Sequence, residues 1–145
     1  MWRSYPGAGI LAVRDGHVLM VLHLRSGKVR WELPSGFVDS SETYEQTAVR
    51  ETLEETGVTV VAGPLLCTAV MDVPCEEFRG INAYFLAASV GNEIPVAGEG
   101  EAIIQAAFVD LSKIRSRDIH PVDRYILSRW KKRKESKPFY FRMVF

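Results

Sequence analysis

The sequence predicts an α/β protein in which a mixed β-sheet lies between helices. Three observations predict it. Short runs rich in apolar and β-branched residues stand on both sides of one long segment, residues 42–56, that contains neither glycine nor proline. A second, amphipathic segment follows the last of these runs. Strands before and after an internal helix, with another helix at the end, fit a sheet that is covered by helices.

Length and composition indicate one globular domain covering residues 1–145. Apolar residues make up 47% of the chain and charged residues 25%, which are ordinary values for a folded protein. The 18 basic and 18 acidic side chains cancel, so no net charge draws the chain to nucleic acid or to an anionic membrane. Two cysteines without CxxC spacing, no secretory leader and no membrane-length apolar run favour a soluble, cytoplasmic protein.

The first expected elements are two strands, residues 7–13 and 17–24. Asp15-Gly16 joins them, and this dipeptide is typical of a two-residue hairpin turn. The two strands are therefore expected to pair in antiparallel fashion. Residues 31–37 contain a proline and a glycine, and they are expected to have an irregular backbone.

Residues 42–56 are expected to form the first helix. Ser40 or Ser41 is the expected N-cap, since a serine oxygen can accept from the free N–H groups of the first turn. Glu42 stands where the helix dipole stabilises an anion, and Gly57 is the expected stop at the C-terminal end.

Sheet is expected to dominate the chain after this helix. Four further strands are expected, at residues 58–61, 65–71, 82–88 and 104–109. Turns separate them at Gly63-Pro64, Val73-Pro74 and Gly91-Asn92. Pro121 suits the first helical position, and it opens a second helix that is expected to continue to about Glu135.

The chemistry of the sequence concentrates in three carboxylates of the first helix. Glu51, Glu54 and Glu55 fall within two turns, and at about 100° per residue they share one face. Like charges at these spacings repel, so a bound cation would stabilise the cluster. Oxygen donors without nearby cysteine or histidine suit Mg²⁺, with Mn²⁺ as the alternative. Considered alone, these residues fit a solvated glutamate-rich face equally well.

The spacing of these glutamates relative to other residues between Gly36 and Val58 favours the metal site. The segment from Gly36 to Val58 reads GFVDSSETYEQTAVRETLEETGV. It resembles the Nudix box, GX5EX7REUXEEXGU, in which U is an aliphatic residue. The matching positions are Gly36, Glu42, Arg50, Glu51, Glu54, Glu55, Gly57 and Val58. Seven fixed letters would coincide by chance at about one start position in 10⁸ to 10⁹.

The chain also departs from the family pattern. Thr52 replaces the aliphatic residue of the box. Gln105 stands three residues before Phe108, where many relatives have a glutamate, which puts a downstream carboxylate in question. Glu99 and Glu101 are the alternatives for that carboxylate.

The resemblance implies the α/β/α Nudix sandwich and a role for each matching residue. It implies that divalent ions, Mg²⁺ before Mn²⁺, are bound by Gly36, Glu51, Glu54 and Glu55. It implies that Glu42 pairs with Arg50 and that these two residues, with Gly57, hold the box in shape. The implied catalytic set is Glu51, Glu54 and Arg50. Either of these glutamates, or a loop carboxylate at Glu99 or Glu101, is the candidate general base.

The activity implied by the resemblance is hydrolysis of a diphosphate bond by water that metal ions orient. The expected substrate is a nucleoside diphosphate linked to another moiety. ADP-ribose or a nucleotide sugar is slightly favoured, because Pro74 resembles a proline of ADP-ribose-cleaving members. Hydrolysis of (d)NTPs or dinucleoside polyphosphates is one alternative, and a non-catalytic module that binds a nucleotide or RNA is another.

Four residues outside the metal set are candidates for binding the substrate: Trp31, Phe37, Glu99 and Glu101. The two aromatic rings can stack on a nucleobase. The three histidines lack mutual metal-ligand spacing and are expected to have surface or core roles. Nucleic acid and membranes are not expected partners, and a homodimer stays open.

Overall fold

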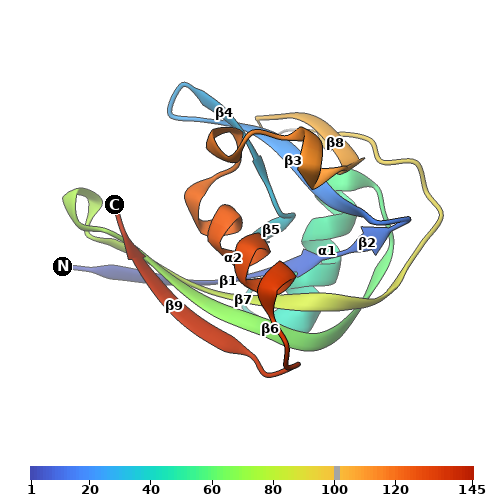
Figure 1. Cartoon of the computed structure of the whole chain (residues 1–145). Coiled ribbons are helices and arrows are strands. Elements are labelled where there is room, and N and C mark those ends of the chain that lie inside the picture. The colour runs from blue at the N-terminus through green and yellow to red at the C-terminus, as the bar shows by residue number, and fades with distance from the viewer. Residues whose placement is uncertain (100–101) are drawn as a thin grey trace.

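The computed structural model describes residues 1–99 and 102–145, and it has the expected α/β class with a mixed sheet and two helices (Figure 1). The strands are β1 (Arg3–Leu11), β2 (Val13–Arg14), β3 (His17–Arg25), β4 (Lys28–Glu32), β5 (Ser35–Phe37), β6 (Val60–Val73), β7 (Phe78–Val90), β8 (Ile103–Val109) and β9 (Phe139–Val144). The α-helices are α1 (Tyr44–Thr56) and α2 (Pro121–Lys132). Short 3-10 turns are η1 (Pro74–Glu76), η2 (Leu111–Lys113) and η3 (Ser116–Asp118).

The strands divide into two sheets. A five-stranded mixed sheet has the order β5-β1-β7-β6-β9, in which β1 is parallel to β7 and β6 is parallel to β9. In the second sheet β3 pairs in antiparallel fashion with β2, β4 and β8. Figure 1 shows α2 between the two sheets, with α1 on the far side of β1 and β7.

The two helices cover opposite faces of the five-stranded sheet. Ile10 of β1 is buried in one core cluster with Ala48 of α1. Its neighbour Leu11 is buried in another with Ile126 of α2. Successive side chains of a strand point to opposite faces. The five-stranded sheet therefore has an apolar core on each face, one under each helix.

The Asp15-Gly16 hairpin is confirmed, but it joins β2 to β3. Asp15 and Gly16 have φ angles of 51° and 76°, as a turn with two left-handed residues requires. The expectation that residues 7–13 pair along residues 17–24 is wrong, because β1 lies in the other sheet. Glycine allows this close packing: a Cβ on Gly9 would lie 2.7 Å from the Pro34 carbonyl oxygen.

The expectation of an irregular backbone over residues 31–37 is wrong for most of its length. Trp31 and Glu32 end β4, and residues 35–37 form β5. Only Leu33-Pro34 lies between them. Pro34 has no N–H to donate, yet its carbonyl accepts from Ile10 N at 3.1 Å, so the chain stays bound to β1 across the gap.

Helix α1 begins at Tyr44, and its N-cap is Thr43 in place of the expected Ser40 or Ser41. Thr43 Oγ1 accepts from Gln46 N at 3.1 Å, and the Gln46 side chain accepts from Thr43 N at 2.9 Å. This reciprocal pair satisfies two N–H groups, which a lone serine could not do. At the other end Gly57 has φ 73° and stops the helix as expected.

The second half of the chain differs from expectation in three places. The two strands expected around Gly63-Pro64 are one strand, β6. At this dipeptide the chain does not turn, and only the register between β6 and β7 shifts. Helix α2 ends at Lys132, before the expected Glu135. Strand β9 was not expected, because its short sequence has no clear strand pattern. It forms by pairing in parallel with β6. Within the described part of the chain, no helix is both long and apolar enough to cross a membrane.

Candidate active site

Helix α1 presents its three carboxylates in different environments. Glu54 is exposed over 57% of its side chain, Glu51 over 17%, and Glu55 is buried with 7% exposure. The side of α1 that carries Glu51 and Glu55 packs against β5, while Glu54 faces solvent. The three carboxylates of this helical face therefore differ in solvent exposure, from buried Glu55 to largely exposed Glu54.

Gly36 of β5 lies directly against Glu51. A Cβ added to Gly36 would be 2.1 Å from the Glu51 carboxyl carbon, so only glycine fits unless Glu51 moves. The position of Gly36 at the start of the box has a physical reason: it lets the β5 backbone approach this carboxylate.

Glu55 is held by the same strand. Its Oε1 accepts a hydrogen bond from Ser35 N at 2.8 Å. Burial, opposed by the hydrogen bond from Ser35 N and assisted by the charges of Glu51 and Glu32, raises the pKa of Glu55 to about 8. A carboxyl in such surroundings gains stability as an anion only if a cation is placed beside it.

Arg50 connects the helix to the loop before it. Its Nε and Nη2 donate to the two oxygens of Glu42 at 2.6 and 2.9 Å. Its Nη1 donates to Glu51 at 2.9 Å and to Glu54 at 3.1 Å. The Arg50 hydrogen bonds hold the pKa of Glu42 at about 2, while the same contacts raise the pKa of Arg50. Arg50 therefore fixes the shape of the box and orients two of its carboxylates.

The donor set has the chemistry that a hard divalent cation requires. Three carboxylates and a backbone carbonyl of Gly36 are all oxygen donors, the set that Mg²⁺ prefers. Gly36 provides the open cradle beside Glu51, and Glu55 is a buried acid with a raised pKa. In residues 1–99 and 102–145, no three His, Cys, Asp or Glu side chains are grouped tightly enough to hold a metal ion.

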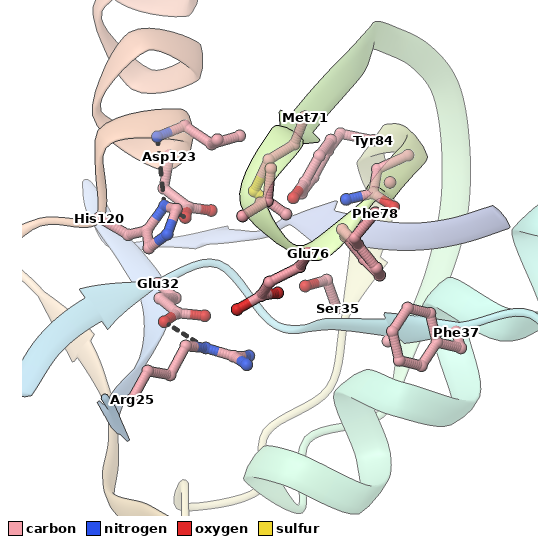
Figure 2. A pocket seen from close by; sticks show the side chains of 15 residues that line it. Arg25, Glu32, Ser35, Phe37, Met71, Glu76, Phe78, Tyr84, His120 and Asp123 are labelled. Carbon is pink, nitrogen blue, oxygen red and sulfur yellow. Dashed lines mark hydrogen bonds and ion pairs between the residues drawn. The ribbon is translucent and has the colours of Figure 1, made fainter. Parts of the chain in front are cut away.

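A pocket of about 310 Å³ adjoins this cluster (Figure 2). Gly36 lines this pocket and also lies directly against Glu51. Phe37, Phe78 and Tyr84 line the pocket, and Figure 2 shows Phe37 and Phe78 on the side away from Glu32, His120 and Asp123. A pocket of this size with an aromatic wall and a polar end suits a small organic ligand.

The polar end of the pocket holds two buried carboxyls. Glu32 binds Arg25 Nε at 2.8 Å, and Asp123 Oδ1 accepts from Leu33 N at 3.1 Å. Burial raises the pKa of Asp123 well above its usual range, and the nearby charge of Glu32 adds to the effect. Burial lowers the pKa of His120 to about 4, so its ring is neutral at pH 7.

Sequence reasoning missed this polar end. Asp123 follows Val122 at the start of α2, where a first-turn acid is usually explained by the helix dipole. A weak signal was available, because Asp123 lies one turn from Ile126 and hence near the apolar face of the helix. His120, expected to have a surface or core role, lines the pocket and caps α2 by accepting from Val122 N at 3.2 Å.

The candidates outside the metal set lie in different parts of the molecule. Phe37 lines the pocket and is 58% exposed. Trp31 is half-buried and packs against the core under α2, so it is not brought into the pocket. Gln105 is exposed on β8. Glu99 is exposed just after Gly98, whose N–H donates to the Glu55 carbonyl at 3.0 Å. Glu101 lies outside the described residues.

Residues 3–130 match the family model described as NUDIX domain. The chain is 31% identical over 104 residues to an ADP-ribose pyrophosphatase of Methanocaldococcus jannaschii, covering 70% of this chain and 59% of that protein. It is 43% identical over 54 residues to an RNA pyrophosphohydrolase of Sphingopyxis alaskensis, covering 37% of this chain and 34% of that protein. The chain thus spans less than two thirds of the length of these relatives.

Solved structures share the fold. The crystal structure of a MutT NUDIX hydrolase from Burkholderia pseudomallei has a TM-score of 0.76 and 25% identity, covering 87% of this chain and 97% of that one. A MutT protein from Bacillus halodurans has a TM-score of 0.79 at 18% identity, covering 97% of this chain and 90% of that one.

Proposed function

This chain belongs to the Nudix family, and from that premise we propose that it hydrolyses a diphosphate bond in a nucleoside diphosphate linked to another moiety, with Mg²⁺ as its cofactor. The observation that carries the proposal is the position of Gly36. It touches the Glu51 carboxylate on one side and borders the pocket on the other. A ligand seated in the pocket would therefore place its phosphates beside the carboxylates of α1.

Each residue of the box has a separate task in this proposal. Glu51, Glu54, Glu55 and the Gly36 carbonyl would hold the cation. When bound, Mg²⁺ activates water and offsets charge on the phosphates. Arg50 keeps Glu51 and Glu54 in place through its two hydrogen bonds and is itself anchored on Glu42.

The reaction is attack by water on one phosphorus, with cleavage of the bridging P–O bond. The bridging oxygen leaves with the electron pair of that bond. The proton of the attacking water goes to a carboxylate. Glu54 and Glu51 are the candidate bases on the helix, and Glu99 is the candidate on the neighbouring loop, which Gly98 holds against the end of α1.

The nature of the attached moiety depends on residues outside the box. ADP-ribose and nucleotide sugars remain in the proposal, since the relative from Methanocaldococcus jannaschii is an ADP-ribose pyrophosphatase. Pro74, the residue that favoured ADP-ribose, begins η1 between β6 and β7, and its neighbour Glu76 lines the pocket. This turn is thus in a position to contact the moiety.

A hydrolysis panel tests the proposal. The protein is incubated with Mg²⁺ and, separately, ADP-ribose, nucleotide sugars, dinucleoside polyphosphates, (d)NTPs and 5′-triphosphorylated RNA, and phosphate-containing products are measured. Turnover of a nucleoside diphosphate derivative that stops on adding EDTA is expected. Nucleotide binding without turnover of any compound would overturn the proposed hydrolysis and indicate a Nudix-fold binding module.

A further inference from the structure

The C-terminal end of α2 and the loop that follows it carry a concentration of positive charge. Residues 129–139 contain six basic side chains and one acid, a net charge of +5, although the charges of the whole chain cancel. Figure 1 shows this segment at the end of α2 that leads into β9, whereas the pocket beside Gly36 is lined by residues from the start of that helix. The segment therefore lies outside the proposed catalytic site.

A cleft of about 370 Å³ opens among these cations. The basic and aromatic residues that line it are Arg129, Lys132, Arg133, Lys134, Lys137 and Phe139. Within residues 1–99 and 102–145, the only ion pair that involves one of these lining cations joins Lys137 Nζ to Glu135 at 3.6 Å, and both of its side chains are largely exposed. Most of this positive charge is thus available to an anion that enters the cleft.

The helix dipole accounts for only part of the charge. Cations in the last turn of a helix are stabilised by its C-terminal carbonyls, and this effect falls off beyond that turn. It covers the three basic residues of the last turn of α2, which ends at Lys132. Arg133, Lys134 and Lys137 come after the end of the helix. Because like charges gathered in one place repel, a bound anion would stabilise this arrangement.

Arg129 is held in place at the cleft by two aromatic rings. Its guanidinium carbon lies 4.6 Å from the centre of the Phe139 ring and 5.7 Å from that of Tyr125, and its Nη1 donates to the Tyr125 hydroxyl at 2.8 Å. Arg129 nevertheless stays exposed. A guanidinium that is fixed before binding loses less conformational entropy when it contacts a ligand, and its planar face can stack on a nucleobase.

These features select among anionic partners. Trp130 and Phe139, the aromatic residues of the segment, pack against the core under α2, so neither is free to insert into a membrane as the apolar side chains of membrane-binding helices do. An acidic peptide supplies charge but no heterocycle for the Arg129 guanidinium. A single strand of nucleic acid supplies both, because each nucleotide carries a phosphate and an accessible base.

We propose that this cleft binds single-stranded nucleic acid, with backbone phosphates against Arg133, Lys134 and Lys137 and a base against the Arg129 guanidinium. The zero net charge of the whole chain, from which nucleic acid was not an expected partner, averages over this segment. Sequence preference is not expected, since phosphates and the flat face of a ring are common to all nucleotides. The proposal goes beyond the hydrolysis proposed above and does not depend on it.

Fluorescence anisotropy of a short, labelled oligo(U) RNA with a 5′-hydroxyl end measures this binding with the whole protein in EDTA. EDTA keeps metal ions away from the box carboxylates, so binding that requires those ions is excluded. We expect the logarithm of the binding constant to fall with the logarithm of the salt concentration with a slope of about −2, as about three phosphate contacts predict. Loss of binding in EDTA, or a slope near zero, would overturn the proposal.

Two competitors separate nucleic acid from other anionic partners. Poly(L-glutamate) of equal charge is expected to displace the RNA about ten-fold less effectively, because it offers no ring to stack. Vesicles that contain phosphatidylserine are expected to compete more weakly still. Competition from either one that equals unlabelled oligo(U) would refute the assignment to nucleic acid.

Variants locate the binding site. Arg133→Gln combined with Lys134→Gln should weaken binding about ten-fold and make the salt slope less steep by about 1.4, since two phosphate contacts are lost. The matched control combines Lys28→Gln with Lys113→Gln, which removes the same charge from two exposed positions outside the cleft and should leave both quantities unchanged. Equal losses in the two double variants would show a response to net charge alone and would exclude the cleft.

Arg129→Lys tests the stacking contact at constant charge. It should weaken binding of oligo(U) about three-fold without changing the salt slope, because the ammonium keeps the charge and lacks the planar face. Unchanged binding in this variant would contradict the contact between Arg129 and a base. Thermal unfolding shows that each variant is folded, and turnover of any substrate found in the hydrolysis panel should be retained in all of them, since the cleft and the pocket beside Gly36 are separate.

Discussion

Glu55 occupies a different environment from the other two carboxylates of α1. It is buried and bound to Ser35 N, whereas Glu54 is largely exposed and bound to Arg50. A buried carboxylate is costly without a cation and strongly attracts one. Among the residues of the box, Glu55 is thus expected to contribute most to metal affinity and least to proton transfer.

Glu55→Gln is expected to lower Mg²⁺-dependent turnover by at least about 100-fold, because it removes a ligand at nearly constant volume. The variant should unfold at a temperature no lower than the wild-type protein in the absence of Mg²⁺, since Gln keeps the oxygen that accepts from Ser35 N. Glu45→Gln, an exposed change in the first turn of the same helix, is the control. Wild-type rates in Glu55→Gln would exclude it as a ligand.

The Glu42 to Arg50 pair makes stability depend on acid pH. The pKa of Glu42 falls from 4.5 in the unfolded chain to about 2 in the folded protein, chiefly through its hydrogen bonds with Arg50. A lowered pKa stabilises the fold above pH 4.5, and this contribution is lost as the pH falls towards 2. Urea unfolding from pH 6 to pH 2 should show a smaller decrease in Glu42→Gln than in the wild-type protein. Parallel curves for the two proteins would refute the assignment.

At the scale of elements, the box depends on how α1 meets its neighbours. β5 approaches Glu51 through Gly36, and the loop before β8 reaches the other end of α1 through Gly98. A Cβ on Gly98 would lie 2.1 Å from the Glu54 carbonyl oxygen. Close contacts at Gly36 and Gly98 therefore set how near β5 and the loop before β8 lie to α1.

Gly98→Ala should push the loop away from α1 and lower the free energy of unfolding by about 1 to 3 kcal/mol. If Glu99 serves the reaction from this loop, turnover falls as well. Glu99→Gln separates the two effects, because it changes the carboxylate and leaves the loop in place. Normal turnover in Glu99→Gln would assign proton transfer to α1 and leave Gly98 a packing role.

At the scale of the whole molecule, the two sheets and α2 create the pocket, and α1 supplies the charge beside it. Residues that line the pocket come from β3, β4, β5, β6, β7 and α2. Such a site forms only in the folded chain, so any ligand or cation that binds it stabilises the fold.

Mg²⁺ at ten times its dissociation constant should raise the unfolding temperature by about 3 to 6 °C, as mass action predicts for a domain of this length. The shift should be largely lost in Glu55→Gln and kept in Glu45→Gln. Scanning calorimetry with and without EDTA measures it. A shift of the same size in all three proteins would place the cation elsewhere.

Several features could be predicted from the sequence because they depend on near neighbours in the chain. The hairpin at Asp15-Gly16, the helix stop at Gly57 and the spacing of the box all belong to this group. Thr43 was also within reach, since a threonine three residues before a glutamine signals a capping box. The box positions remain predictions as metal ligands, and the structure shows only that Gly36 lies against the Glu51 carboxylate.

The pocket could not be predicted, because it joins segments that are far apart in sequence. Leu33 and Asp123, which are 90 residues apart, share a buried hydrogen bond. Burial then shifts the pKa of Asp123, an effect that depends on the surroundings and not on the residue type. Pairing with distant partners likewise places β1 beside β7, in the five-stranded sheet, and makes β9 a strand beside β6. Local spacing thus determined the chemistry expected of α1, whereas long-range packing decided which groups surround the ligand.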